Sequence, residues 1–451
     1  MLENKKTLVF VLIILALSIF THFIRFGHPN QTVFDEVHFG KFLSGYFTGE
    51  YFFDIHPPLG KLLLSATGYV SGFKPGFSFA NIGEMFPDKH YLALRLLPIM
   101  AGTLLPLVVF FLALRLGFSK KTSLLTSLFI VFENALLVQS RFILLDSMLL
   151  LFGFGSLLAY LKYRSGQSLK LLLLAGVLAG LSASVKWTGL GFLGLIIIFQ
   201  LFGWLEQKKI NLKETCLNFT CLILLPFVIY LGIFAIHFKL LPKSGPGNAF
   251  MTPSFQKTLL NNQYGNDPSV KPIGFFKKFT ELNMQMYGSN KRLIAAHPYG
   301  SKWYSWPFMS RTIYYWNKAE GQNESKVYFL GNPFIWWSSS IAVLYLLLNS
   351  ASKLKKMQLD FPSAFILSGF FLNLLPFIGV GRVMFLYHYF TSLVFAILAL
   401  GYLLNQKNKK GLFGLFLFFS ILFFLFFSPF TYGLPLTVPE QNLLFWLSTW
   451  R

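Results

Sequence analysis

The chain has 451 residues, of which 54% are hydrophobic, 18% aromatic and only 12% charged. This composition is too apolar for the core of a water-soluble domain, so it excludes a soluble enzyme and indicates a protein with many membrane-spanning helices. The net charge of +22 would suggest nucleic-acid binding in a soluble protein. Here the lysines gather in short loops between apolar segments, which reports membrane topology and predicts no nucleic-acid partner.

Apolar segments of bilayer length follow one another along the chain. A hydrocarbon slab of about 30 Å requires roughly 20 apolar residues per helix. We therefore predict an all-α polytopic membrane protein with about 11 transmembrane helices, forming one domain over residues 1–451. The predicted spans are residues 7–26, 91–114, 122–139, 143–161, 169–185, 188–204, 215–238, 332–349, 361–379, 384–404 and 411–430.

The basic residues in alternate loops predict the orientation. They all fall on one side if the N-terminus is cytoplasmic. The two long loops, 27–90 and 239–331, then lie on the outer face, together with the short turns at 140–142 and 380–383. The N-terminal apolar stretch is of span length and no small-residue cleavage site follows it, so we expect it to remain as the first helix.

Both long loops have the composition of functional segments. Loop 27–90 has aromatic and apolar residues at near-helical spacing, which predicts interfacial helices that could roof a cavity. Loop 239–331 is rich in Gly, Pro, Asn, Trp and Tyr, and a loop of that length is commonly functional or disordered. Trp303, Tyr304 and Trp306 suit a surface at the level of the lipid headgroups.

Ionisable groups at or within the membrane are costly, so each needs an explanation. The stretch TVFDEVHFG places Asp35 and Glu36 just after the first span. One reading is structural, because carboxylates favour the first turn of a helix. The functional reading rests on His38, Asp54 and His56 in the same loop, because converging titratable groups suggest proton chemistry. The remaining candidates are Arg95, Glu133, Arg141, Asp146, Lys186, Arg311, Arg382 and His388.

Two adjacent carboxylates on a helix cannot point in the same direction. We therefore expect one of the Asp35 and Glu36 side chains to face a cavity. The other would support the backbone or reach a neighbouring loop. His56, in the turn HPP, has a structural alternative as a simple turn residue.

Two arginines lie at similar depth near the outer face. Arg141 is in SRFILLDS and Arg382 is in GVGRVMFLYHYF, and a guanidinium offers forked donors that match phosphate oxygens. Together they could hold a lipid-linked phosphate, although anchoring at the headgroups is the alternative. Asp146 could form a structural ion pair inside the bundle, with Glu133 as a potential neighbour. His388 is a supporting candidate.

The sequence gives little support for a metal site or a nucleotide-binding site. No HxxxH or HExxH pattern occurs, so no metal site is predicted, while a divalent ion at Asp35 or Glu36 stays open. No nucleotide-binding glycine loop of the Walker type occurs. A sugar donor dissolved in the bilayer is therefore favoured over a soluble nucleotide sugar.

Five separated stretches resemble the protein O-mannosyltransferase family. The first is VFDEVHFGKFLSGYFTGEYFFDIHPPLGKLL. It is followed in the same order by QSRFILLDS, SGPGNAFMTPSFQ, HPYGSKWYSWPFMSR with GNPFIWW, and GRVMFLYHYF. The resemblance runs from the first predicted span to the tenth. It implies the C-type glycosyltransferase (GT-C) fold, a polyprenyl or dolichyl phosphate mannose donor, and a serine or threonine acceptor in an exported protein.

The resemblance also implies roles for single residues. The family's catalytic acidic position falls on Asp35, as general base, with Glu36 as an essential companion. Arg141 would contact the donor phosphate. The three MIR repeats of eukaryotic members are absent, Glu133 replaces an expected Asp, and Phe390-Thr391 replaces Leu-Pro. These departures suggest a compact prokaryotic member in the plasma membrane.

The expected chemistry follows from these residues. The phosphate of the donor is a good leaving group, and it leaves as an anion. Its negative charge can be stabilised by cations such as Arg141 and Arg382. The acceptor hydroxyl needs a base, and a base opposite the leaving group would give inversion at the anomeric carbon. Trp303, Tyr304 and Trp306 would position the peptide. The alternatives are a lipid-phosphate-dependent glycosyltransferase acting on lipid A or a polysaccharide, and a transporter, although no repeated halves are visible.

Overall fold

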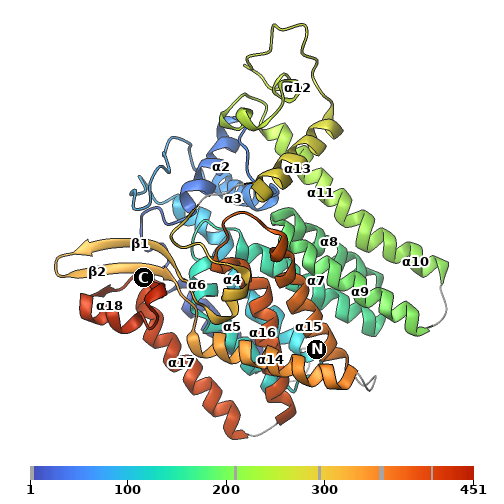
Figure 1. Cartoon of the computed structure of the whole chain (residues 1–451), viewed down its shortest axis with the longest axis vertical. Helices are drawn as coiled ribbons and strands as arrows, with labels where there is room; N and C mark the ends of the chain where they lie inside the picture. The colour runs from blue at the N-terminus through green and yellow to red at the C-terminus, as the bar shows by residue number, and fades with distance from the viewer. Residues whose placement is uncertain (1–4, 208–210, 293–295, 355–359, 408–409) are drawn as a thin grey trace.

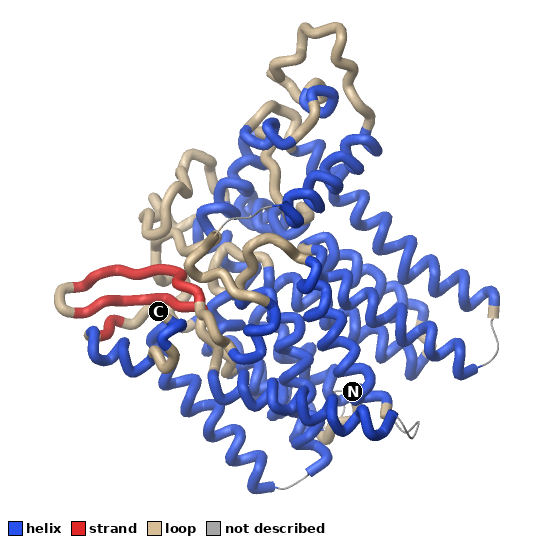
Figure 2. The backbone as a smooth tube through the Cα atoms, in the orientation of Figure 1, coloured by secondary structure: helices blue, strands red, loops and turns tan. Residues whose placement is uncertain are grey.

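The structure, a computed structural model, describes residues 5–207, 211–292, 296–354, 360–407 and 410–451. Long helices pack side by side, and shorter helices and loops cover one end of them (Figures 1 and 2). The helices of this bundle are α1 (Lys5–Phe23), α4 (Tyr91–Arg115), α5 (Lys120–Val131), α6 (Asn134–Ser140), α7 (Asp146–Gly166), α8 (Leu169–Val185), α9 (Leu190–Gln207), α10 (Leu212–Phe219), α11 (Leu225–Leu240), α14 (Pro333–Leu354), α15 (Phe361–Leu374), α16 (Phe390–Lys407) and α17 (Lys410–Tyr432).

The helices are apolar enough to make this an integral membrane protein. In the described part of the chain, eight helical segments are long and apolar enough to cross a bilayer, or nine if the bent pair α5 and α6 is one span. The remaining two predicted spans, 143–161 and 169–185, fall on α7, which carries three charged residues, and on α8, which has only 17 residues. The count of 11 therefore stays a prediction.

Helix α16 lies at the centre of the bundle. In its apolar window 89% of the residues are buried, against 17% for α17 and 22% for the segment formed by α10 and α11. The outer helices therefore present their apolar faces to lipid, whereas α16 packs against protein on all sides. The N-terminal end of this central helix adjoins the residues that form the site described below.

The covered end of the bundle contains four further α-helices among the described residues. Helices α2 (Glu36–Thr48) and α3 (Leu59–Ser71) lie within loop 27–90, and α12 (Pro253–Gln256) and α13 (Phe275–Arg292) lie within loop 239–331 (Figure 1). Gly49 ends α2 with a left-handed φ of 75°, which glycine adopts without steric cost. Helices at this place in loop 27–90 agree with the near-helical spacing of its apolar residues.

A small sheet is a feature that the sequence analysis does not predict. Strands β1 (Ile313–Glu320), β2 (Asn323–Phe329) and β3 (Pro435–Leu436) form an antiparallel sheet in the order β1-β2-β3. Its hairpin projects from the bundle beside α18 (Val438–Leu444) (Figure 2). The strand residues are rich in aromatic and β-branched types, and Gly321 turns the chain with a φ of 66°.

Candidate active site

A cavity of about 610 Å³ opens near the covered end of the bundle. Part of its wall is polar or charged and is formed by Asp146, Lys186, Lys291, Arg382 and His388. Residues of α13 also line it, and Asn290 ties that helix to the first long loop by donating its amide to the Ile55 carbonyl at 3.2 Å. The apolar part of the wall includes Leu149, Leu190, Leu372, Phe377 and Phe390.

The charged wall is built from helix ends. Lys186 follows the last residue of α8, and its ammonium lies 2.7 Å from the Asp146 carboxylate at the first turn of α7. Gln139 donates to the second carboxylate oxygen of Asp146 at 2.6 Å. Asp146 thus forms a structural ion pair, but its partner is Lys186. The anticipated neighbour Glu133 instead accepts from the backbone N–H groups of Leu136 and Asn332.

Arg382 and its neighbour His388 complete this polar part of the wall. A guanidinium nitrogen of Arg382 lies 3.2 Å from His388 Nε2, and the Arg382 Nε has no hydrogen-bond partner among the described residues. Lys186, Arg382 and Lys291 of α13 therefore present three cationic side chains to one cavity. Such a cluster fits an anionic group such as a phosphate.

Asp35 stands just before α2 and is not itself among the residues that line the cavity, but it lies close to Tyr387 and Lys186, which do line it. Its carboxyl is partly buried, and the Tyr387 side chain is within hydrogen-bonding reach of it. Burial raises the pKa of Asp35 to about 7; the nearby Lys186 ammonium opposes this rise and Asp146 adds to it. Near neutral pH the protonated and deprotonated forms of this carboxyl are therefore both populated. Such a pKa suits a group that takes up a proton during the reaction.

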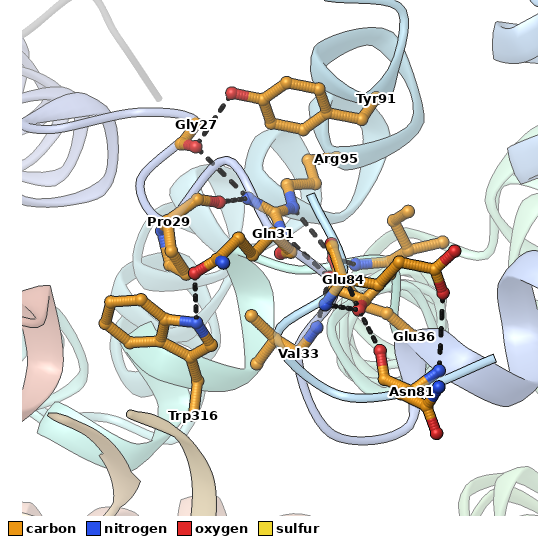
Figure 3. A network of polar contacts seen from close by, with 12 residues as sticks. Gly27, Pro29, Gln31, Val33, Glu36, Asn81, Glu84, Tyr91, Arg95 and Trp316 are labelled. Atoms are coloured by element: carbon orange, nitrogen blue, oxygen red, sulfur yellow. Dashed lines mark hydrogen bonds and ion pairs between the residues drawn. The ribbon is translucent and has the colours of Figure 1, made fainter. Parts of the chain in front are cut away.

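Glu36 has a different position from its neighbour Asp35. Its carboxylate is fully buried and accepts two hydrogen bonds from Arg95, both at 2.7 Å, and further bonds from the N–H groups of Val33 and Ile143. Arg95 in turn donates to the carbonyls of Gly27, Pro29 and Gln31 (Figure 3). Glu36 thus fixes the loop that carries Asp35 and does not face the cavity.

The other candidates of the first loop divide in the same way. The Lys61 ammonium pairs with Asp54 and donates to the carbonyls of His56 and Pro57, so Asp54 supports the turn into α3. His56 lines the cavity, and burial lowers its pKa well below the usual range, which keeps the imidazole neutral. His38 is exposed and lies outside the cavity wall.

Arg141 does not line the cavity. Its guanidinium donates to the backbone carbonyls of His22, Ile24 and Arg25 at 2.6 to 3.0 Å and stacks 4.9 Å above the Tyr432 ring. These contacts use two of its three nitrogens, while its Nε has no hydrogen-bond partner among the described residues. Arg141 thus holds the end of α1, its contact with a donor phosphate stays a prediction, and Lys186 is the residue that lines the cavity together with Arg382.

The aromatic residues of the second loop differ in exposure. Trp306 is fully buried and stacks on the His388 ring, with 5.9 Å between ring centroids. Trp303 is partly buried and Tyr304 is 58% exposed. Trp306 thus supports His388 from behind, and only its two neighbours are accessible to a peptide.

Some site residues have no role in the sequence analysis. Lys186 is named there only among the costly ionisable groups. A lysine at the end of an apolar segment is by itself an indication of a functional site. Tyr387 and Asn290 carry no charge and give no such signal. Among the described residues, no group of three or more His, Cys, Asp or Glu side chains is placed to hold a metal ion.

Comparison with protein families gives two matches along the chain. The family described as dolichyl-phosphate-mannose-protein mannosyltransferase matches residues 12–242. The C-terminal four TMM region of protein-O-mannosyltransferase matches residues 275–450.

Individual relatives agree with these matches. Dolichyl-phosphate-mannose–protein mannosyltransferase 4 of Candida albicans is 36% identical over 292 residues, covering 61% of this chain and 38% of that protein. Mannosyltransferase 3 of Saccharomyces cerevisiae, with the same descriptive name, is 31% identical over 348 residues, covering 71% and 46%. Protein O-mannosyl-transferase 2 of Danio rerio is 32% identical over 295 residues, covering 62% and 39%. The chain thus spans less than half the length of these relatives.

Solved structures share the fold. The S. cerevisiae protein O-mannosyltransferase Pmt1-Pmt2 complex bound to the sugar donor matches with a TM-score of 0.92 at 23% identity, over 100% of this chain and 93% of that one. An oligosaccharyltransferase of Archaeoglobus fulgidus matches with a TM-score of 0.52 at 13% identity, over 96% of this chain and 55% of that one. The chain therefore has the GT-C fold and belongs to the protein O-mannosyltransferase family of glycosyltransferases.

Proposed function

We propose that this protein transfers mannose from a polyprenyl phosphate mannose to serine or threonine hydroxyls of exported proteins, with inversion at the anomeric carbon. The observation that carries the proposal is the juxtaposition of the Asp35 carboxyl with a cavity whose wall presents Lys186 and Arg382. A base next to a pair of cations is what transfer from a sugar phosphate to a hydroxyl requires.

The donor would enter the cavity from the membrane. Its phosphate fits between Lys186 and Arg382, because both cations face the same space and Arg382 Nε lacks a partner among the described residues. The polyprenyl chain fits along the apolar wall that Leu190 and Leu372 help to form. The sugar would then lie between the phosphate and the Asp35 carboxyl.

Asp35 would act as the general base. As the acceptor oxygen bonds to the anomeric carbon, its proton passes to the Asp35 carboxylate. The bond from that carbon to the phosphate oxygen breaks at the same time, and its electron pair leaves with the polyprenyl phosphate. Lys186 and Arg382 offset the charge that develops there, so no proton donor is needed for the leaving group.

The acceptor would approach from the outer face, where Trp303 and Tyr304 are accessible. The distribution of Lys and Arg among the loops supports a cytoplasmic N-terminus and an outer active site in the plasma membrane of a prokaryote. A lipid A or polysaccharide acceptor gains no support, because the relatives described above are named for protein acceptors.

Membranes that contain the full chain test the proposal directly. With polyprenyl phosphate mannose and a Ser/Thr-rich peptide, we expect mannose to appear on the peptide hydroxyls in the α configuration if the donor is the β anomer. Mass spectrometry and glycosidase digestion give the readout. Mannose that appears on membrane lipid but never on peptide would overturn the proposed acceptor class.

Arg382→Gln is expected to lower kcat/KM for the donor by roughly 10- to 100-fold, because a charge-assisted contact to the phosphate is lost. The measurement is transfer at varied donor concentration. The matched control is Arg311→Gln, since Arg311 also has an Nε without a partner among the described residues but does not line the cavity. Equal kinetics in the two variants would remove Arg382 from the donor site.

A further inference from the structure

Three polar side chains of the cavity wall have a buried oxygen atom without a hydrogen-bond partner among the described residues. They are Thr188, Asn373 and Thr391, and all three line the cavity that holds Lys186 and Arg382. Asn373 and Thr391 are 4% and 2% exposed. Two hydroxyls and one amide oxygen without partners in one cavity each require an explanation, and their shared location favours a common one.

Local geometry keeps these oxygen atoms free of protein partners. Asn373 donates its amide N–H to the Gly369 carbonyl at 2.8 Å, one turn earlier in α15, and its Oδ1 is left unused. It packs over Gly191, where an added Cβ would clash with that oxygen. The absence of a side chain at Gly191 therefore makes room for an amide whose acceptor is unused.

The three groups lie on segments that also supply polar or closely packed residues of the cavity wall. Thr188 follows Lys186 by two residues, and Thr391 follows His388 by three residues at the start of α16. Asn373 lies near the end of α15, where it contacts Gly191 near the start of α9. Neutral donors and acceptors thus line the same cavity as the cations Lys186 and Arg382.

The chemistry of the donor decides what can satisfy these groups. A polyprenyl chain has no hydrogen-bonding atoms, and lipid tails cannot replace the missing partners either. The phosphate is anionic and pairs with Lys186 and Arg382, whereas a carbonyl oxygen such as Asn373 Oδ1 would repel it. The sugar ring is left, with hydroxyls that both donate and accept.

We propose that Thr188, Asn373 and Thr391 form a subsite for the sugar hydroxyls of the donor, which selects its sugar. The inference rests on the proposed function and deepens it by naming residues that recognise the transferred group. A site built to hydrogen-bond a hydroxyl rejects a donor that lacks it, because its own buried groups then stay unpaired. Asp35 is not part of this subsite.

The test compares the binding of polyprenyl phosphate mannose with that of bare polyprenyl phosphate to the purified full chain. The wild type should bind the mannosylated lipid more tightly. Thr391→Val and Asn373→Leu should each reduce that preference by about tenfold, since each removes a hydrogen bond to the sugar but no contact to the phosphate. Thr391→Val keeps the side-chain shape and removes no hydrogen bond of the hydroxyl within the described residues, so it should fold as well as the wild type.

Asn218→Leu is the matched control. Asn218 is also buried, donates to the carbonyl four residues earlier and has an Oδ1 without a partner among the described residues, but it does not line the cavity. Its replacement should leave the preference for the mannosylated lipid unchanged.

The outcomes separate this inference from the proposed function. An unchanged preference in both cavity variants, with a wild type that transfers mannose to peptide, overturns the subsite alone and assigns the orphaned atoms to ordered water. A wild type that shows no preference for the mannosylated lipid and no transfer overturns the proposed function. A tenfold loss confined to the cavity variants, with mannose favoured less over glucose in transfer assays, supports the subsite.

Discussion

Asp35→Asn should reduce mannosyl transfer by about a thousandfold, the middle of the range for a general base. The substitution keeps the size of the side chain but removes its capacity to take a proton from the acceptor. Donor binding should persist, because Lys186 and Arg382 are untouched. The measurement is kcat with saturating donor and peptide in membranes that hold equal amounts of folded protein.

The control for this substitution is Asp88→Asn. Asp88 is an exposed carboxylate of the same loop, paired with His90, so its replacement changes the net charge equally without touching the cavity. Transfer by this variant should match the wild type. An Asp35→Asn protein that keeps more than a tenth of the wild-type rate would exclude Asp35 as the base.

The pH dependence gives the same residue a second readout. Because the pKa of Asp35 is raised to about 7, the wild-type rate should rise with pH, reach half its maximum near pH 7 and level off about one unit above it, and this limb should vanish in Asp35→Asn. The raised pKa means that the folded state binds the proton more tightly than the unfolded state. Stability contributed by the protonated group is therefore lost as pH rises through 7, and Asp35→Asn should be more stable than the wild type above that pH.

The helices could be predicted from the sequence because apolar length alone determines them. Every predicted span has a helix at its position, including the pair α5 and α6, which bends by 59° between Val131 and Asn134. The hairpin of β1 and β2 is not predicted because it lies in a loop whose Trp and Tyr residues equally suit the headgroup region. Its alternation of buried and exposed residues is interrupted by a bulge at Tyr315.

The site could be predicted only in part, because the sequence shows which residues are charged but not where their side chains point. The sequence indicates that Asp35 and Glu36 point apart, but the partner Arg95 is 59 residues from Glu36 and becomes visible only in the fold. From the sequence, Arg141 and Lys186 are equally costly charges to place at or within a membrane. The carbonyls at the end of α1 occupy Arg141, whereas Lys186 keeps a place on the cavity wall, and no local pattern separates these outcomes.

Arg95→Met should destabilise the protein by about 3 to 5 kcal/mol, because it leaves the Glu36 carboxylate buried without its counter-ion. Neither side chain has any exposed surface. The carbonyls of Pro29 and Gln31 also lose their donor. We expect a low yield of folded protein and a lowered unfolding temperature in detergent. Lys318→Met, which breaks an exposed pair with Glu320 at 3.8 Å, should have no measurable effect.

Combining Arg95→Met with Glu36→Gln distinguishes two causes of the destabilisation. One is the unpaired buried charge of Glu36, and the other is the loss of the remaining contacts of the Arg95 side chain. The glutamine side chain carries no charge, so the methionine that replaces Arg95 no longer faces an unpaired carboxylate. The double variant should therefore be less destabilised than the sum of the single variants by roughly 0.5 to 3 kcal/mol. Additive effects would mean that Arg95 acts only through the loop carbonyls.

The double variant should also differ from the wild type in activity. Because Glu36 accepts a hydrogen bond from the Ile143 N–H as well, the double variant should still hold Asp35 less firmly. Its transfer rate should therefore stay below that of the wild type even where folding is restored.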